Sequence, residues 1–173
     1  MDERFFTRLG TRVLGSPPEH VEKAPNGMGA ASDWVIKRYP ELMRRYPLRY
    51  PNENVALVVA VDGDNQGHRR RKLRFDEELS QRNMNPREER ERVAICLPTW
   101  SVETWVACLC AWNPPSGPLD ESRSFKLDVD RALTSGQLSL ANAVENWSQT
   151  PPLALSSLDD ARIEFRRALV SDR

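Results

Sequence analysis

The stretch "VALVVAV", residues 55–61, decides the fold of this chain. Seven apolar residues follow one another without a polar interruption, and most of them are β-branched. A run of this kind is typical of a strand covered on both faces, as strands are in parallel sheets. A second run, "VAICL", occupies residues 93–97, and residues 69–83 between the two runs predict a helix. We therefore expect a β-α-β unit in which the two strands are parallel and are adjacent or one strand apart.

Helical patterns surround this unit. A helix is expected around residues 5–13, and a second begins near Ser32 and should kink or restart at Pro40. The segment "SVETWVACLCAW" follows the second strand and has the apolar stripe of an amphipathic helix. Strands that alternate with helices predict an α/β fold, with a central, mostly parallel sheet flanked by helices.

The composition of the sequence changes after Trp112, where proline, glycine and serine become frequent. We expect residues 1–112 to form the α/β domain. Residues 113–173 would form a loop and a helical C-terminal extension packed on that domain. Helices are expected in this extension near 139–148 and 157–170.

Composition limits the class of protein. The chain has 173 residues, with 25 Lys+Arg and 25 Asp+Glu, so a uniformly basic nucleic-acid coat is excluded, although a local basic patch is not. Its three cysteines form no C-x-x-C pair, and two histidines make a His-based zinc site a poor interpretation. With no apolar run of about 20 residues and no signal-peptide pattern, we expect a cytoplasmic protein with reduced thiols.

Two acids follow the first strand in the motif "DGDNQG". Asp62 ends the apolar run and Asp64 comes two residues later, where ligands bind in open α/β sheets. Such hard oxygen ligands suit Mg²⁺ or Mn²⁺. A calcium loop is rejected because its twelfth position would be Leu73 rather than an acid, and neither a dinucleotide-binding fingerprint nor a phosphate loop is present. An acidic turn with no ligand remains the alternative.

Glu103 is the third candidate ligand. It lies in the first turn of the helix after the second strand, inside the otherwise apolar segment "PTWSVETWVACL". A helix N-terminus favours an acid for its own sake, which is the competing interpretation. An unpartnered carboxylate in such surroundings would be costly, however, and a metal or a basic side chain would relieve that cost. We expect Asp62, Asp64 and Glu103 to converge.

A basic run, residues 69–72, follows the acids at once. Two of its four charges are expected on a solvated helix face, and the others would contact phosphates beside the metal. Arg69, Arg70 and Lys23 are the predicted phosphate or nucleic-acid contacts.

The segment "LVVAVDGDNQG" followed by "VAICLPTWSVETWVACL" resembles Toprim-like nuclease domains, notably the small stand-alone bacterial proteins associated with phage defence. The resemblance spans residues 3–112. It implies a parallel sheet flanked by helices, with metal ligands at Asp62, Asp64 and Glu103. Such domains usually open with a strand that ends in a catalytic glutamate. This chain begins inside the following helix, where Glu3 is the only nearby acid that could stand in for that glutamate.

The leading functional hypothesis is a Mg²⁺-dependent nuclease or phosphodiesterase module acting on DNA or RNA. The alternative is a catalytically inactive Toprim-like subunit that docks on a larger effector or an ATPase. A sheet edge left open by the absent first strand, and an exposed Trp100 or Trp147, would suit a protein partner or a homo-oligomer. A phosphatase acting on a small phosphoester is a third interpretation.

Overall fold

The computed structural model describes residues 2–25, 31–49, 55–63, 66–149 and 155–169. Two helices precede the sheet, and the strands are joined through a third. In chain order these elements are α1 (Asp2–Leu14), α2 (Ala31–Arg49), β1 (Leu57–Ala60), α3 (Gly67–Gln81) and β2 (Val93–Cys96). The rest of the described chain is helical and irregular. Its elements are α4 (Val102–Leu109), α5 (Lys126–Thr134), α6 (Leu140–Glu145), the 3₁₀ turn η2 (Asn146–Ser148) and α7 (Ser156–Leu169).

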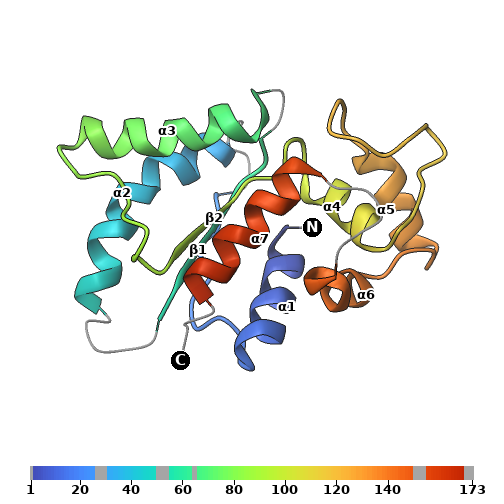
Figure 1. Ribbon diagram of the computed structural model, residues 1–173, viewed down its shortest axis with the longest axis horizontal. Coiled ribbons are helices and arrows are strands. Elements are labelled where there is room, and N and C mark those ends of the chain that lie inside the picture. Colours follow the sequence, from blue (N-terminus) through green and yellow to red (C-terminus); the bar gives the residue numbers. More distant parts are fainter. Residues whose placement is uncertain (1, 26–30, 50–54, 64–65, 150–154, 170–173) are drawn as a thin grey trace.

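β1 and β2 form a parallel pair (Figure 1), in which Leu57 is opposite Val93 and Ala60 is opposite Cys96. The predicted pairing of the two apolar runs is therefore confirmed, although each strand is shorter than its run. The chain is a mixed α/β protein with a small two-stranded parallel sheet flanked by helices.

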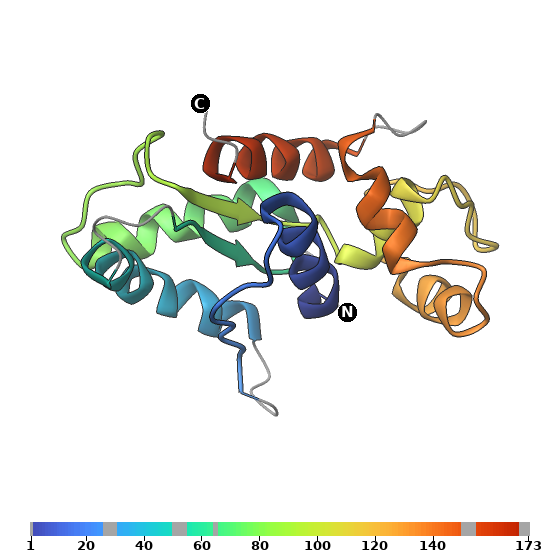
Figure 2. The same cartoon turned by 90° about the horizontal axis from the view of Figure 1, so that it is seen from below.

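The two faces of the sheet carry separate cores because side chains alternate along a strand. Ala94 and Cys96 join α1 and α7 in the larger core, whereas Val93 and Ile95 join α2 and α3 in the smaller one. Figure 2 shows α7 and α2 on opposite sides of the strands. Helices thus cover both faces, as the sequence predicts.

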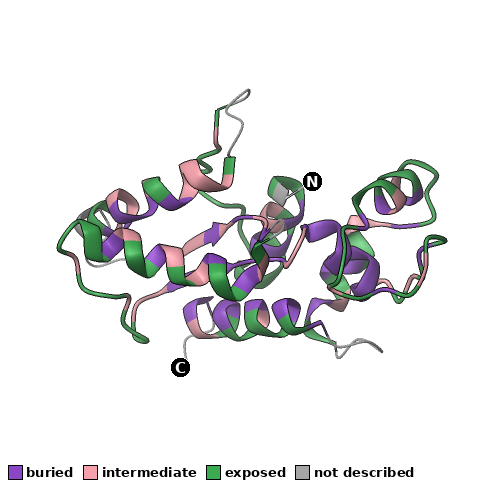
Figure 3. Ribbon diagram, turned by 90° about the horizontal axis from the view of Figure 1, so that it is seen from above, coloured by how far each residue is buried: buried purple, intermediate pink, exposed green. Residues whose placement is uncertain are grey.

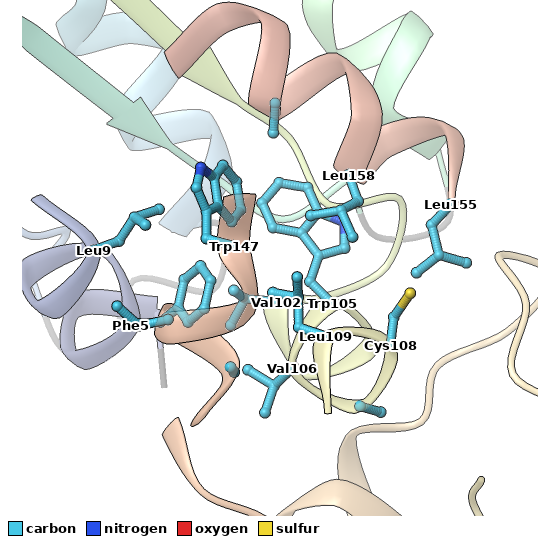
Figure 4. Packing of buried hydrophobic residues seen from close by; sticks show 14 of the residues in the cluster. Phe5, Leu9, Val102, Trp105, Val106, Cys108, Leu109, Trp147, Leu155 and Leu158 are labelled. Atoms are coloured by element: carbon cyan, nitrogen blue, oxygen red, sulfur yellow. The ribbon is translucent and has the colours of Figure 1, made fainter. Parts of the chain in front are cut away.

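Aromatic side chains from distant parts of the chain fill the larger core (Figure 4). The rings of Phe5 and Trp147 are 6.0 Å apart, and those of Trp105 and Trp147 are 6.3 Å apart. Trp147 is buried, so the expectation that it is available on the surface for a partner is wrong. Because this core joins α1 and α4 to α6 and α7, the C-terminal helices pack directly on the α/β unit.

Two helical details differ from the expectations: α2 does not restart at Pro40, and a helix forms where none was predicted. α2 continues as one helix through Pro40, whose ring is buried and so packs in the interior. Residues 126–134, which lie outside the predicted helices, form α5.

No helix within the described parts of the chain has both the length and the apolar character needed to cross a bilayer.

The outer edge of β2 is closed by charged side chains rather than by another strand. Glu164 of α7 accepts a hydrogen bond from the Ile95 amide at 3.4 Å, and Arg87 donates to the Val93 carbonyl at 2.5 Å. Arg167 donates to the same carbonyl. Figure 3 shows that α7 turns a buried face toward the sheet and an exposed face to solvent, and Glu164 is one of the buried residues of this helix.

Glu164 is itself held by cations. Arg87 donates to both of its oxygens at 2.5 and 2.9 Å, Arg167 donates at 2.9 Å and Lys72 at 3.0 Å. Burial raises the pKa of Glu164, but the hydrogen bonds from these three cations outweigh it and lower the pKa to about 2. The carboxylate is therefore ionised at neutral pH and fully paired.

Candidate functional site

The carboxyl ends of β1 and β2 lie against each other. Directly after Asp62, the Gly63 amide donates to the Pro98 carbonyl at 2.7 Å. A Cβ atom on Gly63 would lie 2.5 Å from the Thr99 carbonyl oxygen and 2.7 Å from that of Pro98, closer than real contacts allow. Glycine at this position is therefore required for the close approach, which brings the half-buried Asp62 beside the segment that leads into α4.

Glu103 lies in the first turn of α4, as predicted, and its side chain is 1% exposed. Its Oε2 atom is buried and has no hydrogen-bond partner among the residues that the structure describes, and the same holds for Ser101 Oγ and Thr104 Oγ1. Burying a carboxylate oxygen without a hydrogen-bond donor costs free energy, and no described residue offsets that cost at this turn.

A polar network that sequence reasoning missed lies next to this turn. Glu121, in the loop before α5, accepts hydrogen bonds at Oε1 from Thr99 Oγ1 (2.9 Å) and from the amide and hydroxyl of Ser157, and at Oε2 from Ser156. Burial raises the pKa of Glu121, but these hydrogen bonds outweigh it and lower the pKa below its usual range. Trp105 Nε1 donates to Ser157 Oγ at 2.8 Å. The network ties the end of β2 to α7.

His68 joins α3 to the same place. Its Nδ1 atom is 3.3 Å from Thr99 Oγ1, and its Nε2 atom is 3.1 Å from a carboxylate oxygen of Asp160 on α7. The ring is buried, whereas Asp160 is exposed. The position of α3 relative to the strand ends is thereby fixed by side chains from three elements.

The basic run divides into structural and surface residues. Arg71 is buried, donates to the Gly63 carbonyl at 3.4 Å and lies 3.6 Å from Asp33, while Lys72 pairs with Glu164. Arg69 and Arg70 are exposed on α3. The ion pairs of Arg71 and Lys72 within the protein were not expected, and phosphate contact by Arg69 and Arg70 stays a prediction.

A groove of about 720 Å³ runs along β1 and includes Asp62 in its lining. Lys23 and Glu3 line the same groove and form an ion pair of 2.7 Å. Two of the predicted site residues, Asp62 and Lys23, thus face one cavity together with Glu3. Glu103 does not line this groove.

Metal binding by the three predicted acids stays a prediction. Asp64 lies outside the described residues, and the described side chains include no cluster of three or more histidine, cysteine, aspartate or glutamate residues arranged for a metal ion. Asp62 and Glu103 occupy the strand end and the helix start where the sequence places them.

The chain matches no protein-family model, no curated protein and no solved structure.

Proposed function

We propose that this protein is a Mg²⁺- or Mn²⁺-dependent phosphodiester-cleaving module of the Toprim-like kind that acts on nucleic acid. The observation that carries the proposal is the buried Glu103 carboxylate, whose Oε2 atom has no donor within the described chain. It lies at the carboxyl side of a parallel strand pair, where open α/β sheets bind their ligands. A metal ion that prefers oxygen ligands would satisfy the unpaired Glu103 oxygen, and Asp62 and Asp64 would supply further carboxylate ligands.

Each residue has a distinct role in this proposal. Asp62, Asp64 and Glu103 would hold the ion, which polarises a phosphate and makes a bound water more acidic. Arg69 and Arg70, exposed on the helix that follows the acids, would contact the phosphate backbone. Lys23 would do so from the groove that Asp62 lines, once it exchanges Glu3 for a phosphate.

The cellular setting is part of the proposal. All three cysteines are free thiols, and burial raises the pKa of Cys108 to about 11, so that this thiol stays protonated and unreactive. Free thiols of this kind suit the reducing cytoplasm. A role in bacterial defence against phage rests on the sequence resemblance alone.

The test is cleavage of plasmid DNA, linear DNA, single-stranded DNA and RNA, with Mg²⁺, with Mn²⁺ and with chelator. We expect metal-dependent cleavage that falls about a hundredfold or more in Asp62→Asn and in Glu103→Gln, the loss typical of removing a group that stabilises charge at the reacting centre. Asp130→Asn, the same chemical change on the exposed face of α5, serves as the control and should keep full activity. Cleavage that persists with chelator, or that both site variants retain, would contradict the proposal.

A second candidate is favoured by one different observation. The free edge of β1, described below, suits a catalytically inactive subunit that docks on a larger effector or ATPase. Absence of cleavage on every substrate, together with a stable complex formed through β1, would favour this candidate over the nuclease.

A further inference from the structure

The backbone of β1 is paired on one side only. The amides of Leu57, Val61 and Gly63 donate to the carbonyls of Arg92, Cys96 and Pro98 at 2.9, 3.2 and 2.7 Å. Since successive residues of a strand direct their backbone groups to opposite edges, those of Val58 and Ala60 face away from β2. Among the residues that the structure describes, the N–H and C=O groups of Val58 and Ala60 have no hydrogen-bond partner on that side.

Within the described residues, this open edge lacks the side-chain features that usually protect one. Exposed edge strands commonly carry lysine, proline or a bulge, or are covered by other parts of the chain. β1 has only apolar side chains and no proline, and Leu57, Val58 and Ala60 are half-buried, whereas every residue of β2 is buried. The sequence of β1 is therefore that of an interior strand, although its position is that of an edge strand.

The space beside the edge has a volume that one short strand could fill. In a sheet, a residue occupies about 3.3 Å along the strand, 4.8 Å across it and 10 Å between layers, or about 160 Å³. The groove of about 720 Å³ therefore holds four to five extended residues, about the length of β1. A helix could not pair with the Val58 and Ala60 backbone groups, because its own N–H and C=O groups are already hydrogen-bonded within the helix, which is also 10–12 Å wide.

The walls of the groove restrict what can enter it. Phe6 of α1 and Trp34 and Val35 of α2 line it, and the extended segment 18–24 forms the far wall. That wall is held by the ion pairs Lys23–Glu3 (2.7 Å) and Arg38–Glu22 (3.1 Å). Because these charges on the rim are already paired, an uncharged apolar occupant is the complementary one.

We propose that β1 accepts an extended segment of a partner polypeptide as a third strand. The segment would be four to five residues long, with apolar side chains on both faces, one set packing near Phe6 and the other near Val35. Main-chain hydrogen bonds to Val58 and Ala60 would supply affinity, and the two apolar walls would supply specificity. This inference does not depend on the proposed hydrolysis.

The first experiment uses a defined strand probe. The peptide Lys-Val-Ala-Val-Ala-Val-Lys, acetylated and amidated, is titrated into isotopically labelled protein and followed by amide chemical shifts. We expect saturable shifts at the amides of Val58 and Ala60. The same peptide with its five central amides N-methylated keeps its side chains but cannot pair with a strand, and it should produce none of these shifts.

The second experiment changes the protein. Ala60→Pro removes an N–H group that the fold does not use and should weaken the probe about tenfold or more, the effect of one lost hydrogen bond and a displaced strand. If that variant unfolds, Thr7→Arg tests the same point, since it fills the groove from α1 without touching the ladder. Leu127→Arg, at an exposed position of α5, is the control and should bind as the wild type does.

Two outcomes would overturn the inference. One is the absence of shifts at Val58 and Ala60 at millimolar peptide, or shifts that N-methylation and both groove variants leave unchanged. The other is a wild-type dimer in light-scattering measurements that Ala60→Pro converts to a monomer, since the occupant of the edge would then be a second copy of this chain.

Discussion

Two glutamates are buried in this protein, and their surroundings are opposite. Glu164 is 6% exposed and receives hydrogen bonds from Arg87, Arg167, Lys72 and the Ile95 amide. Glu103 is 1% exposed, and its Oε2 atom receives none within the described chain. Burial removes both side chains from water, but within the described chain both oxygens of Glu164 are paired, whereas Glu103 Oε2 has no donor. The difference separates a carboxylate whose partners lie within the protein from one that, under the proposed function, would bind a metal ion.

Their positions agree with this distinction. Glu164 lies along the side of β2, where it accepts a hydrogen bond from the Ile95 amide. Glu103 lies near the carboxyl ends of the strands, where an α/β sheet binds its ligands. The four predictions below test this contrast.

The largest change in unfolding free energy is expected for Glu164→Gln. The change leaves Arg87, Arg167 and Lys72 around a neutral acceptor, and breaking a buried ion pair from one side costs about 3–5 kcal/mol of unfolding free energy. Urea unfolding followed by circular dichroism measures it. Glu145→Gln, on the exposed face of α6, is the matched control and should change the free energy by about 0.5 kcal/mol at most. A loss no larger than the control's would show that the charge cluster does not stabilise the fold.

Acid should reproduce much of this loss in the wild type. A carboxyl group whose pKa is lower in the folded protein contributes stability above its unfolded pKa of about 4.5, and the contribution disappears as the pH falls toward the folded pKa of about 2. For Glu164 this amounts to about 3 kcal/mol between pH 5 and pH 2. Urea unfolding at steps of pH should show the decline, and a correspondingly shallower one in Glu164→Gln. Equal slopes in the two proteins would refute the assignment to Glu164.

Glu103→Gln should stabilise the protein, whereas Glu164→Gln destabilises it. Without metal, replacing a buried carboxylate that lacks a donor by a neutral amide of the same shape should raise the unfolding free energy by about 1 kcal/mol. The measurement is urea unfolding in chelator, with Glu145→Gln again as the control. Destabilisation comparable to that of Glu164→Gln would mean that Glu103 is paired after all, and the contrast between the two glutamates would be lost.

The metal itself should change the unfolding free energy by an amount similar to that of Glu103→Gln. If Mg²⁺ binds only the folded protein, a tenfold excess over its dissociation constant raises the unfolding free energy by about 1.4 kcal/mol. We expect this rise in the wild type and in Asp130→Asn, and not in Glu103→Gln or Asp62→Asn. Sodium chloride at matched ionic strength is the salt control. An equal rise in all four proteins would identify a general salt effect instead of a site.

The strands were the most predictable part of the molecule. Continuous apolar runs at 55–61 and 93–97 have few other interpretations, and the helix between them requires a parallel pair. The position of Glu103 in the first turn of a helix was predictable for a similar reason, since the apolar stripe of α4 begins beside it. The number of strands was harder to predict. The apolar sequence of β1 is typical of a strand with a neighbour on each side, but β1 is paired with β2 alone among the described residues.

Charged side chains that act inside the protein were the least predictable. Arg71 and Glu164 belong to polar-looking helices, where a charge is normally read as solvated, and their partners are far away in sequence. Glu121 lies in a loop rich in proline and serine with no periodicity, and its partner Ser157 lies 36 residues further along the chain. Only the three-dimensional arrangement brings such residues together.

The closure of β2 by Glu164 has a consequence for the order of events during synthesis. The last residue of β2 is Cys96, and about seventy further residues must be made before Glu164 exists. At about 5–20 residues per second, the strand leaves the ribosome several seconds before the side chain that shields it. During that interval both edges of the nascent sheet are open to pairing with other chains. Until its last helix is in place, the growing chain is exposed to aggregation, and a truncation before residue 164 would make that exposure permanent.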